Sequence, residues 1–186
     1  MMVSDPVTEG LFAARTVLVF GEIDTALART VSAQLLALAA RGDEPIVVLV
    51  NSHGGHVESG DTIYDVIRSI EPEVKMVGTG WVVSAGALIY CAAKKENRVA
   101  LPNTRFMLHQ PLGGSSGPAT DIEIEVSQIL QMRDRLNRTF ARASGQPLDK
   151  IARDTERNFW MSAEEAREYG IVGRVIESLA ELRDSP

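Results

Sequence analysis

Ser84 and His109 are the two side chains that could together perform nucleophilic chemistry. Ser84 opens an apolar run of small and aliphatic residues, 84–93, which is predicted to be a buried helix. A serine at the first turn of such a helix often caps it, because its oxygen accepts from backbone donors that lack partners. A helix N-terminus also favours negative charge, which suits a nucleophile. Ser84 alone is compatible with both roles.

His109 would supply the base that a nucleophilic serine needs within hydrogen-bond reach. It follows the expected strand 105–108, at a strand-to-loop edge where catalytic residues are often placed. A lone histidine there is equally compatible with an ordinary hydrogen-bonded core residue. His53 and His56 lie three residues apart in a glycine turn, a spacing that could hold a metal ion. No cysteine or carboxylate cluster accompanies them, so we expect no metal site.

A pair of glycines, Gly54 and Gly55, follows the expected strand 46–50. One interpretation is a strand-to-helix turn that needs positive φ, which glycine adopts without steric cost. The other is a backbone N–H aimed at the negative charge that develops during acyl transfer. The glycines alone do not decide between the two.

The composition is that of one globular domain, residues 1–186. Hydrophobic residues make up 45% and charged residues 24% of the chain, and the net charge of -6 disfavours nucleic acid as a partner. Cys91, the single cysteine, lies in the apolar run, so an internal disulfide is excluded. We find no signal-peptide pattern and no apolar run long enough for a membrane span, and we predict a cytoplasmic protein.

Strand and helix signals alternate along the chain, which predicts an α/β fold with a parallel sheet. The continuous apolar run 46–50 predicts that both faces of this sheet are covered. Residues 1–14 show no period and predict a flexible arm, and the Gly- and Ser-rich segment 112–120 predicts an exposed strand or loop. The pattern of 121–143 predicts a long helix that projects and packs against another subunit. The predicted strands are 16–20, 46–50, 74–77, 98–101, 105–108 and 172–176, and the predicted helices are 26–40, 57–70, 84–93, 121–143, 148–157 and 162–169.

Four blocks of the sequence resemble the proteolytic subunit of the ATP-dependent Clp protease, ClpP. The resemblance covers nearly the whole chain beyond the N-terminal arm. It implies a crotonase-like α/β core of repeated ββα units with a protruding handle region at 112–143. It also implies a tetradecamer of two stacked seven-membered rings, into which an AAA+ Clp unfoldase feeds unfolded polypeptides. The blocks are NSHGGHVESG (51–60), GWVVSAGAL (80–88), LPNTRFMLHQPLGG (101–114), and ATDIEIE followed by IARDTER (119–125 and 151–157).

The same resemblance implies roles for individual residues. Ser84 matches the nucleophile, and His109 matches the general base. We expect no cofactor in this subunit, because ATP would be used by the partner unfoldase. The other matches are Asn158 at the third position of the triad, Gly55 and Ala85 as oxyanion donors, Leu112, Gly113 and Gly114 as handle residues that pair with the substrate backbone, and Asp154, Glu156 and Arg157 as contacts between subunits.

Asn158 departs from the family pattern, which usually has Asp at this position. An amide oxygen can accept from the Nδ1–H of His109, but it carries no charge to stabilise the imidazolium. In a chymotrypsin-type protease the same exchange has a measured cost of about 10⁴ in rate. Three outcomes are therefore open: a slow enzyme, an enzyme active only on assembly, or a structural ring subunit that partners a second ClpP-like subunit. His53 and His56 also depart from the pattern, and they either add positive charge at low pH or face solvent.

The leading interpretation is a serine endopeptidase acting inside a closed chamber. The alternative from a different class is a structural or regulatory ring subunit. An acyl-CoA hydratase or isomerase on the same fold is disfavoured, because no carboxylate acid or base is apparent. An α/β-hydrolase is also disfavoured, because Val82 occupies the first glycine position of the GxSxG motif.

Overall fold

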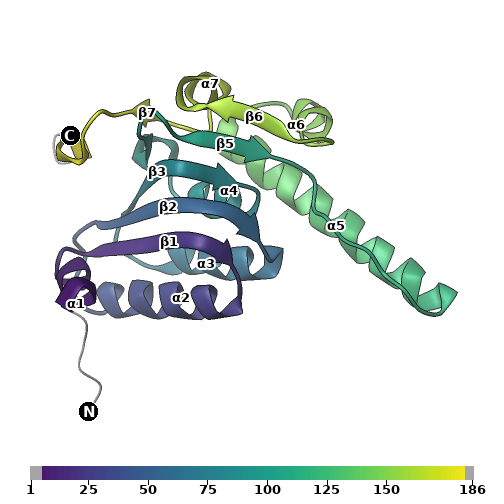
Figure 1. Ribbon diagram of the computed structural model, residues 1–186, viewed down its shortest axis with the longest axis horizontal. Helices are drawn as coiled ribbons and strands as arrows, with labels where there is room; N and C mark the ends of the chain where they lie inside the picture. Colours follow the sequence, from purple (N-terminus) through teal and green to yellow (C-terminus); the bar gives the residue numbers. More distant parts are fainter. Residues whose placement is uncertain (1–5, 183–186) are drawn as a thin grey trace, which may run out of the picture.

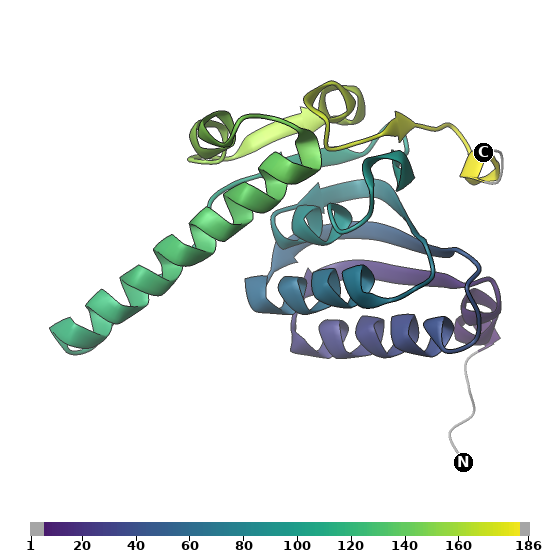
Figure 2. The same cartoon turned by 180° about the vertical axis from the view of Figure 1, so that it is seen from behind.

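The structure, a computed structural model, describes residues 6–182 (Figures 1 and 2). The strands are β1 (Thr16–Ile23), β2 (Ile46–Gly55), β3 (Val74–Val83), β4 (Arg98–Ala100), β5 (Arg105–Leu108), β6 (Phe159–Ser162) and β7 (Arg174–Val175). The helices are α1 (Pro6–Ala13), α2 (Thr25–Ala39), α3 (Val57–Ser69), α4 (Ala85–Tyr90), α5 (Ala119–Ser144), α6 (Leu148–Asp154) and α7 (Ala163–Tyr169), with short 3-10 helices η1 (Lys95–Asn97) and η2 (Leu179–Leu182).

The strands form one seven-stranded sheet that branches at β3. Its main path, β1-β2-β3-β4-β7, is parallel throughout. On the edge away from β2, β3 pairs with two strands, because residues 76–78 pair with β4 and residues 81–83 pair with β5. β6 then pairs antiparallel with β5. This branch places the end of β3, which leads into Ser84, directly beside the end of β5, which leads into His109.

Helices α2, α3 and α4 lie against one face of the sheet (Figure 2), and the main core lies between them and the strands. β1 and β2 are bent by register shifts, so each has two segments before the helix that follows. The alternation of strands and helices predicted from the apolar runs is confirmed. Each helix turns an apolar stripe toward the sheet, with Leu35 of α2 and Ile63 of α3 fully buried.

The opposite face of the sheet is only partly covered. Among the described residues it carries a small cluster around Val77 and Val99, which Ile176 completes. Val47 and Leu49 of β2 point to this face and remain half-buried. The prediction that both faces are covered is therefore confirmed for one face and only in part for the other, since the apolar run of β2 contributes to one deep core and one shallow one.

α5 leaves the body of the molecule as a projecting helix (Figure 1). Leu136 and Phe140 in its last third are buried and anchor it to the core. Its first half exposes apolar side chains, including Ile124 and Val126. The predicted projection is confirmed, and the contact with another subunit stays a prediction. No helix within residues 6–182 combines the length and apolar character needed to cross a bilayer.

Residues 6–13 of the expected flexible arm, 1–14, form a helix instead. Residues 6–13 form α1, whose Phe12 packs against the core, and the guanidinium of Arg41 lies 4.6 Å from the centre of the Phe12 ring. These contacts are tertiary, so the local sequence, which mixes Pro, Gly and charged residues, did not indicate them. Residues 1–5 of the arm lie outside the described residues.

Strand pairing extends several elements beyond their apolar runs. β2 continues through the glycine segment to Gly55, because Gly54 and Gly55 pair with Glu22 and Ile23 of β1. β3 likewise runs to Val83 rather than ending at 77, and β6 was missed altogether. Conversely, α4 and α6 are shorter than predicted, ending at Tyr90 and Asp154, and β7 spans only 174–175. Pairing partners, which are distant in sequence, decide these limits.

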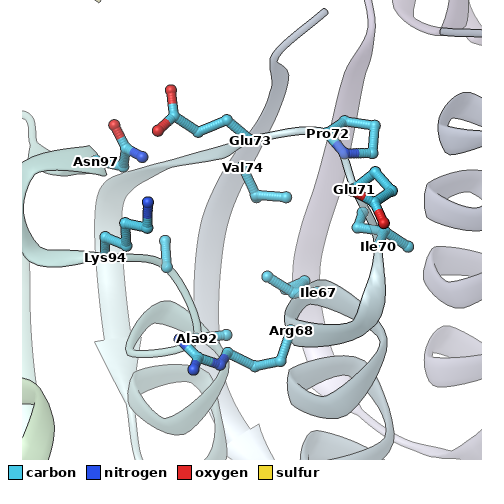
Figure 3. Close-up of a pocket in the computed structure, with 11 residues that line it drawn as sticks. Ile67, Arg68, Ile70, Glu71, Pro72, Glu73, Val74, Ala92, Lys94 and Asn97 are labelled. Carbon is cyan, nitrogen blue, oxygen red and sulfur yellow. The ribbon is translucent and has the colours of Figure 1, made fainter. Parts of the chain in front are cut away.

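A pocket opens at the edge of the sheet where the strands begin (Figure 3). It lies between the C-terminal end of α3 and the segment that follows α4. Its charged lining residues are Arg68 of α3, Lys94 after α4, and Glu71 and Glu73 between α3 and β3. This edge is opposite to the one that holds Ser84 and His109, because the parallel strands run from here toward Ser84.

Candidate active site

Ser84 occupies the sharp turn between β3 and α4, with φ 56 and ψ -120. A non-glycine residue in this conformation costs about 1–3 kcal/mol, and such residues cluster at functional sites. The turn is fixed on both sides. The Ser84 N–H donates to the carbonyl of Met107 at 2.9 Å, and the Ser84 carbonyl accepts from the N–H of Leu88 at 3.1 Å. The surrounding backbone thus holds Ser84 in its strained conformation.

The Ser84 hydroxyl does not cap α4, because its side chain makes no capping hydrogen bond. Its Oγ instead lies 2.8 Å from Nε2 of His109. β3 and β5 create this contact, since Val83 pairs with Met107 and the two side chains follow their strands at the same edge. Of the two roles open for Ser84, the structure excludes the cap.

His109 is half-buried, and burial lowers the pKa of its imidazole. The ring therefore stays neutral to a lower pH than a free histidine, and in its neutral form Nε2 has a free lone pair when the proton is on Nδ1. In that tautomer the Ser84 hydroxyl donates to Nε2. A neutral imidazole hydrogen-bonded to a serine is the arrangement that general-base catalysis requires.

The glycine pair lies against this site. Gly54 has φ 97, and a Cβ at this position would lie 2.7 Å from the Cβ of Ser84. Gly55 has φ 147, and a Cβ there would collide with the backbone carbonyl of Ile23. Glycine is thus required at both positions for conformation and for space. Gly54 was not singled out from the sequence as a neighbour of Ser84, although the glycine pair was the available signal.

The backbone donors expected around Ser84 have the right local setting. Ala85 is the first residue of α4, so its N–H belongs to the turn whose donors have no intrahelical partner. These N–H donors point out of the N-terminal end of α4, toward Ser84, and the serine side chain does not cap them. Gly55 ends β2 on the neighbouring strand. The role of these two N–H groups stays a prediction.

A small apolar pocket adjoins Ser84 and His109. It has room for about 10 Å³, roughly one water molecule. Sequence periodicity placed Leu136 and Phe140 on the apolar stripe of the helix 121–143, and only the fold brings these two side chains to the serine. The apolar side chains that line it are Val57, Leu88, Pro111, Leu136 and Phe140.

Asn158 reaches the neighbourhood of His109 but not its ring. Leu108 pairs with Phe159, so residue 158 lies opposite residue 109 just past the end of the β5-β6 ladder. The loop is held there because Gln110 donates from its N–H to the carbonyl of Thr155 at 2.6 Å. Asn158 is exposed, and within residues 6–182 no hydrogen bond joins its amide to His109.

The expected handle residues lie along the projecting helix. Residues 112–118 have no regular secondary structure, and the chain runs beside α5 (Figure 1). A Cβ at Gly113 would lie 2.7 Å from Cδ1 of Ile129, so glycine allows close approach to the helix. Leu112 is 85% exposed, and Gly114 has open space around it. The segment is an exposed loop, one of the two predicted forms, and its backbone is accessible to a ligand.

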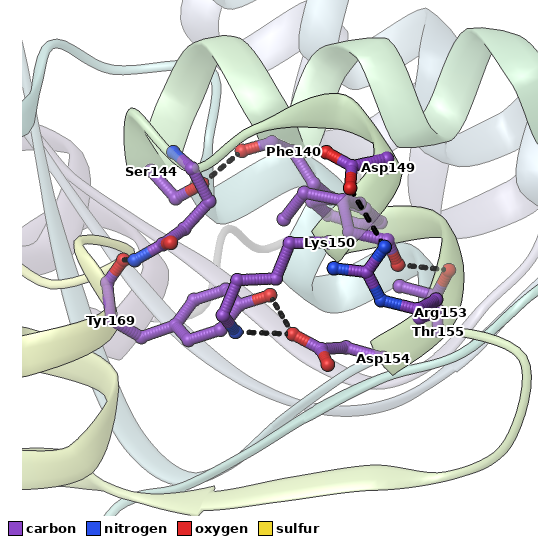
Figure 4. Close-up of polar contacts among 10 residues, drawn as sticks. Phe140, Ser144, Asp149, Lys150, Arg153, Asp154, Thr155 and Tyr169 are labelled. Carbon is purple, nitrogen blue, oxygen red and sulfur yellow. Dashed lines mark hydrogen bonds and ion pairs between the residues drawn. The ribbon is translucent and has the colours of Figure 1, made fainter.

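The three charged residues expected at subunit contacts differ in setting (Figure 4). Asp154 accepts hydrogen bonds from the ammonium of Lys150 and the hydroxyl of Tyr169, both at 2.6 Å, which ties α6 to α7. Glu156 and Arg157 are exposed in the loop before β6. The structure thus gives Asp154 a role within its own chain, and contacts between subunits stay a prediction for all three.

The two remaining histidines are placed apart from each other. The ring of His53 lies 4.2 Å from that of Trp81. Nδ1 of His56 lies 3.0 Å from Oγ of Ser59, and its Nε2 lies 3.1 Å from the carboxylate of Glu58. Each ring thus has neighbours of its own on the protein surface.

Comparison with known proteins places this geometry in a family. Residues 2–179 match the Clp protease family. ATP-dependent Clp protease proteolytic subunit 2 of Gluconobacter oxydans is 61% identical over 176 residues, which cover 93% of this chain and 78% of the relative. Proteolytic subunit 3 of Rhizobium johnstonii is 58% identical over 172 residues, which cover 92% of this chain and 89% of the relative.

Two solved structures have the same fold. ClpP1 from Listeria monocytogenes has a TM-score of 0.85 and 52% identity, covering 95% of this chain and 99% of that one. A variant of the same ClpP1 with one asparagine replaced by aspartate has a TM-score of 0.89 and 53% identity, with the same coverage. The predicted ClpP fold is thereby confirmed, and the chain belongs to the Clp protease family, among its proteolytic subunits.

Proposed function

We propose that the chain is a serine endopeptidase, in which Ser84 attacks the substrate carbonyl and His109 accepts the serine proton. The observation that carries this proposal is the 2.8 Å contact between Ser84 Oγ and His109 Nε2. The lowered pKa of His109 supports it, because a neutral imidazole is free to take the proton. His109 then returns that proton to the leaving amine, and water releases the acyl group from Ser84 by the same route.

The negative oxygen of the tetrahedral intermediate is stabilised by the N–H groups of Ala85 and Gly55. Both belong to backbone that is already held in place in the free protein, since Ala85 begins a buried helix and Gly55 is paired in the sheet. Donors that are already oriented do not have to reorganise during the reaction. One such donor contributes about 10²–10³ in rate in other serine proteases.

Asn158 is the third member of the triad in this proposal. Its position opposite His109 in the β5-β6 register brings it within reach of Nδ1 after a change of side-chain rotamer. The amide oxygen would then accept from Nδ1–H and select the tautomer that the reaction requires. Because the amide is neutral, the imidazolium gains little stabilisation, and peptide hydrolysis is slow.

Substrates are unfolded polypeptides, held as an added strand by the backbone of 112–114. The exposure of Leu112 and Gly114 supports this arrangement. The exposed apolar residues of α5 support assembly into rings, and a Clp unfoldase that uses ATP delivers the substrate. The small pocket beside Ser84 favours a small or flexible side chain before the cleaved bond.

A fluorophosphonate probe tests the nucleophile directly. We expect slow, covalent labelling of Ser84, identified by peptide mass mapping, and no labelling of Ser84→Ala. His109→Gln should label far more slowly, because the base is lost. Ser59→Ala, which changes another buried serine, should label like the wild type.

The main alternative is a structural ring subunit beside a second ClpP-like subunit. It is favoured by the missing hydrogen bond between Asn158 and His109. If Ser84 stays unlabelled in every assembly state, alone and with the second subunit, the endopeptidase proposal fails and this alternative holds.

A further inference from the structure

A third pocket lies between the C-terminal ends of three helices, α3, α4 and α5. It has a volume of about 210 Å³ and is remote from Ser84, which sits at the opposite end of α4. The pocket is strongly cationic. Half of its ten lining residues are Lys or Arg, and none is Asp or Glu. The cationic residues are Arg68, Lys94, Lys95, Arg98 and Arg142.

Arg98 is the buried centre of this pocket. It is 1% exposed, and its Nε has no hydrogen-bond partner. Its Nη2 donates to the carbonyl of Ala143 at 2.6 Å, and its Nη1 has only the sulfur of Cys91, at 3.7 Å. No carboxylate within residues 6–182 forms an ion pair with this guanidinium. A buried charge is normally paired, so Arg98 lacks the anion that its position requires.

The polar side chains next to Arg98 do not supply that anion. Burial raises the pKa of the Cys91 thiol, and burial raises the pKa of Tyr90 well above its ordinary value. Both groups are therefore neutral. Tyr90 in addition donates its hydroxyl proton to the carbonyl of Val99 at 2.7 Å. The compensation present is partial, and comes from the carbonyl ends of α4 and α5.

The rim of the pocket adds further unpaired cations. Arg68, Lys94 and Arg142 are exposed, and in the described part of the chain none of them forms a salt bridge. The Arg142 side chain donates to the hydroxyl of Thr139 at 3.3 Å. The neighbouring pocket of Figure 3 shares Arg68 and Lys94, and its glutamates belong to that pocket rather than to this one.

We propose that this pocket binds a multivalent oxyanion of the phosphate class, held by Arg98 from below and by Arg142 and Lys94 at the rim. A guanidinium presents parallel N–H donors that match two oxygens of such an anion, and here its unpartnered Nε becomes one of them. The cluster of positive charge favours a dianion over a monovalent carboxylate. This inference does not rest on the endopeptidase proposal.

Calorimetric titration of the purified full-length protein with inorganic phosphate tests the site. We expect saturable binding that sulfate competes for, and that acetate at the same ionic strength does not. Bound phosphate should also raise the melting temperature. ADP is titrated separately, because its phosphoryl groups offer the same chemistry. If ADP binds more tightly than phosphate and with the same dependence on these residues, a nucleotide is the source of the anion.

Exposed rim variants keep the test independent of folding. Arg142→Gln and Lys94→Gln should each weaken phosphate binding about tenfold, the effect expected for a hydrogen bond to a charged group. Arg98→Met should abolish it, provided that this buried variant folds. Arg29→Gln removes the same charge from the exposed face of α2 and should bind like the wild type. Absence of saturable binding, equal binding of acetate, or rim variants that bind like Arg29→Gln would overturn the proposal.

Discussion

Replacing Asn158 by Asp should accelerate peptide hydrolysis, because a carboxylate beside His109 stabilises the imidazolium that forms in the transition state. Two unit charges about 4 Å apart attract by about 1 kcal/mol in bulk water and about 4 kcal/mol near a protein surface. Residue 158 is exposed, so the lower part of this range applies. We therefore expect about a tenfold gain in kcat, since each 1.4 kcal/mol corresponds to about a factor of ten.

The pH profile gives this prediction a second readout. Burial lowers the pKa of His109, which favours the neutral imidazole. A carboxylate at position 158 would raise that pKa again, because it favours the charged ring. The acid limb of the kcat/KM profile should therefore move to higher pH in Asn158→Asp while the plateau rises.

A matched control separates a local effect from a change in net charge. Asn103→Asp introduces the same charge in the exposed turn at the other end of β5, away from His109. Its rate and pH profile should match the wild type in a short-peptide assay on assembled protein. If Asn158→Asp behaves like this control in both readouts, residue 158 does not act on His109, and the assigned triad is wrong.

Three further predictions concern the same site. Because burial lowers the pKa of His109, hydrolysis by the wild type should persist below about pH 6.5, the ordinary histidine pKa, and fall only as the ring becomes protonated; a pH series of kcat/KM checks this. Gly54→Ala places a Cβ 2.7 Å from the Cβ of Ser84 at φ 97, so it should lower kcat by about 10²-fold or more and the free energy of unfolding by about 1–3 kcal/mol. Gly10→Ala has open space around it inside helix α1, so in the same rate and melting measurements it should leave kcat unchanged and raise the free energy of unfolding by about 0.5–1 kcal/mol. Leu136→Ala should enlarge the pocket beside Ser84 and shift cleavage toward larger side chains in a peptide series, at a cost in stability of about 2–5 kcal/mol; an unchanged preference would show that this pocket does not receive the substrate.

The sequence predicts those parts of the fold whose information is local. The β-branched runs that begin β1 and β2, and the apolar stripes of α2 and α3, are each legible within a dozen residues. The missed parts depend on distant partners. β6 exists because β5 is there to pair with it, and α1 forms where Phe12 can pack against the core.

The candidate site shows the same division. Residue types identified Ser84 and His109 as candidates, and the resemblance to ClpP paired them, but neither could say that the serine side chain leaves the cap position. That follows from the branch of the sheet, which puts Val83 beside Met107. The position of the Asn158 side chain could not be predicted from the sequence either, since it depends on a loop whose carbonyl groups accept hydrogen bonds from Gln110.

Helix α4 has a candidate site at each end, the serine site at its N-terminal end and the cationic pocket at its C-terminal end. All six of its residues are buried, so packing rather than capping holds it in place. The Ser84 side chain does not satisfy the donors of its first turn, which is the setting that the proposed oxyanion site requires. At its other end, Arg98 meets the C-terminal cap at Cys91 without a carboxylate of its own. The unpaired donors near this helix therefore lie at its two ends, the N–H groups of its first turn at one end and Arg98 Nε at the other, where a ligand could accept hydrogen bonds from them.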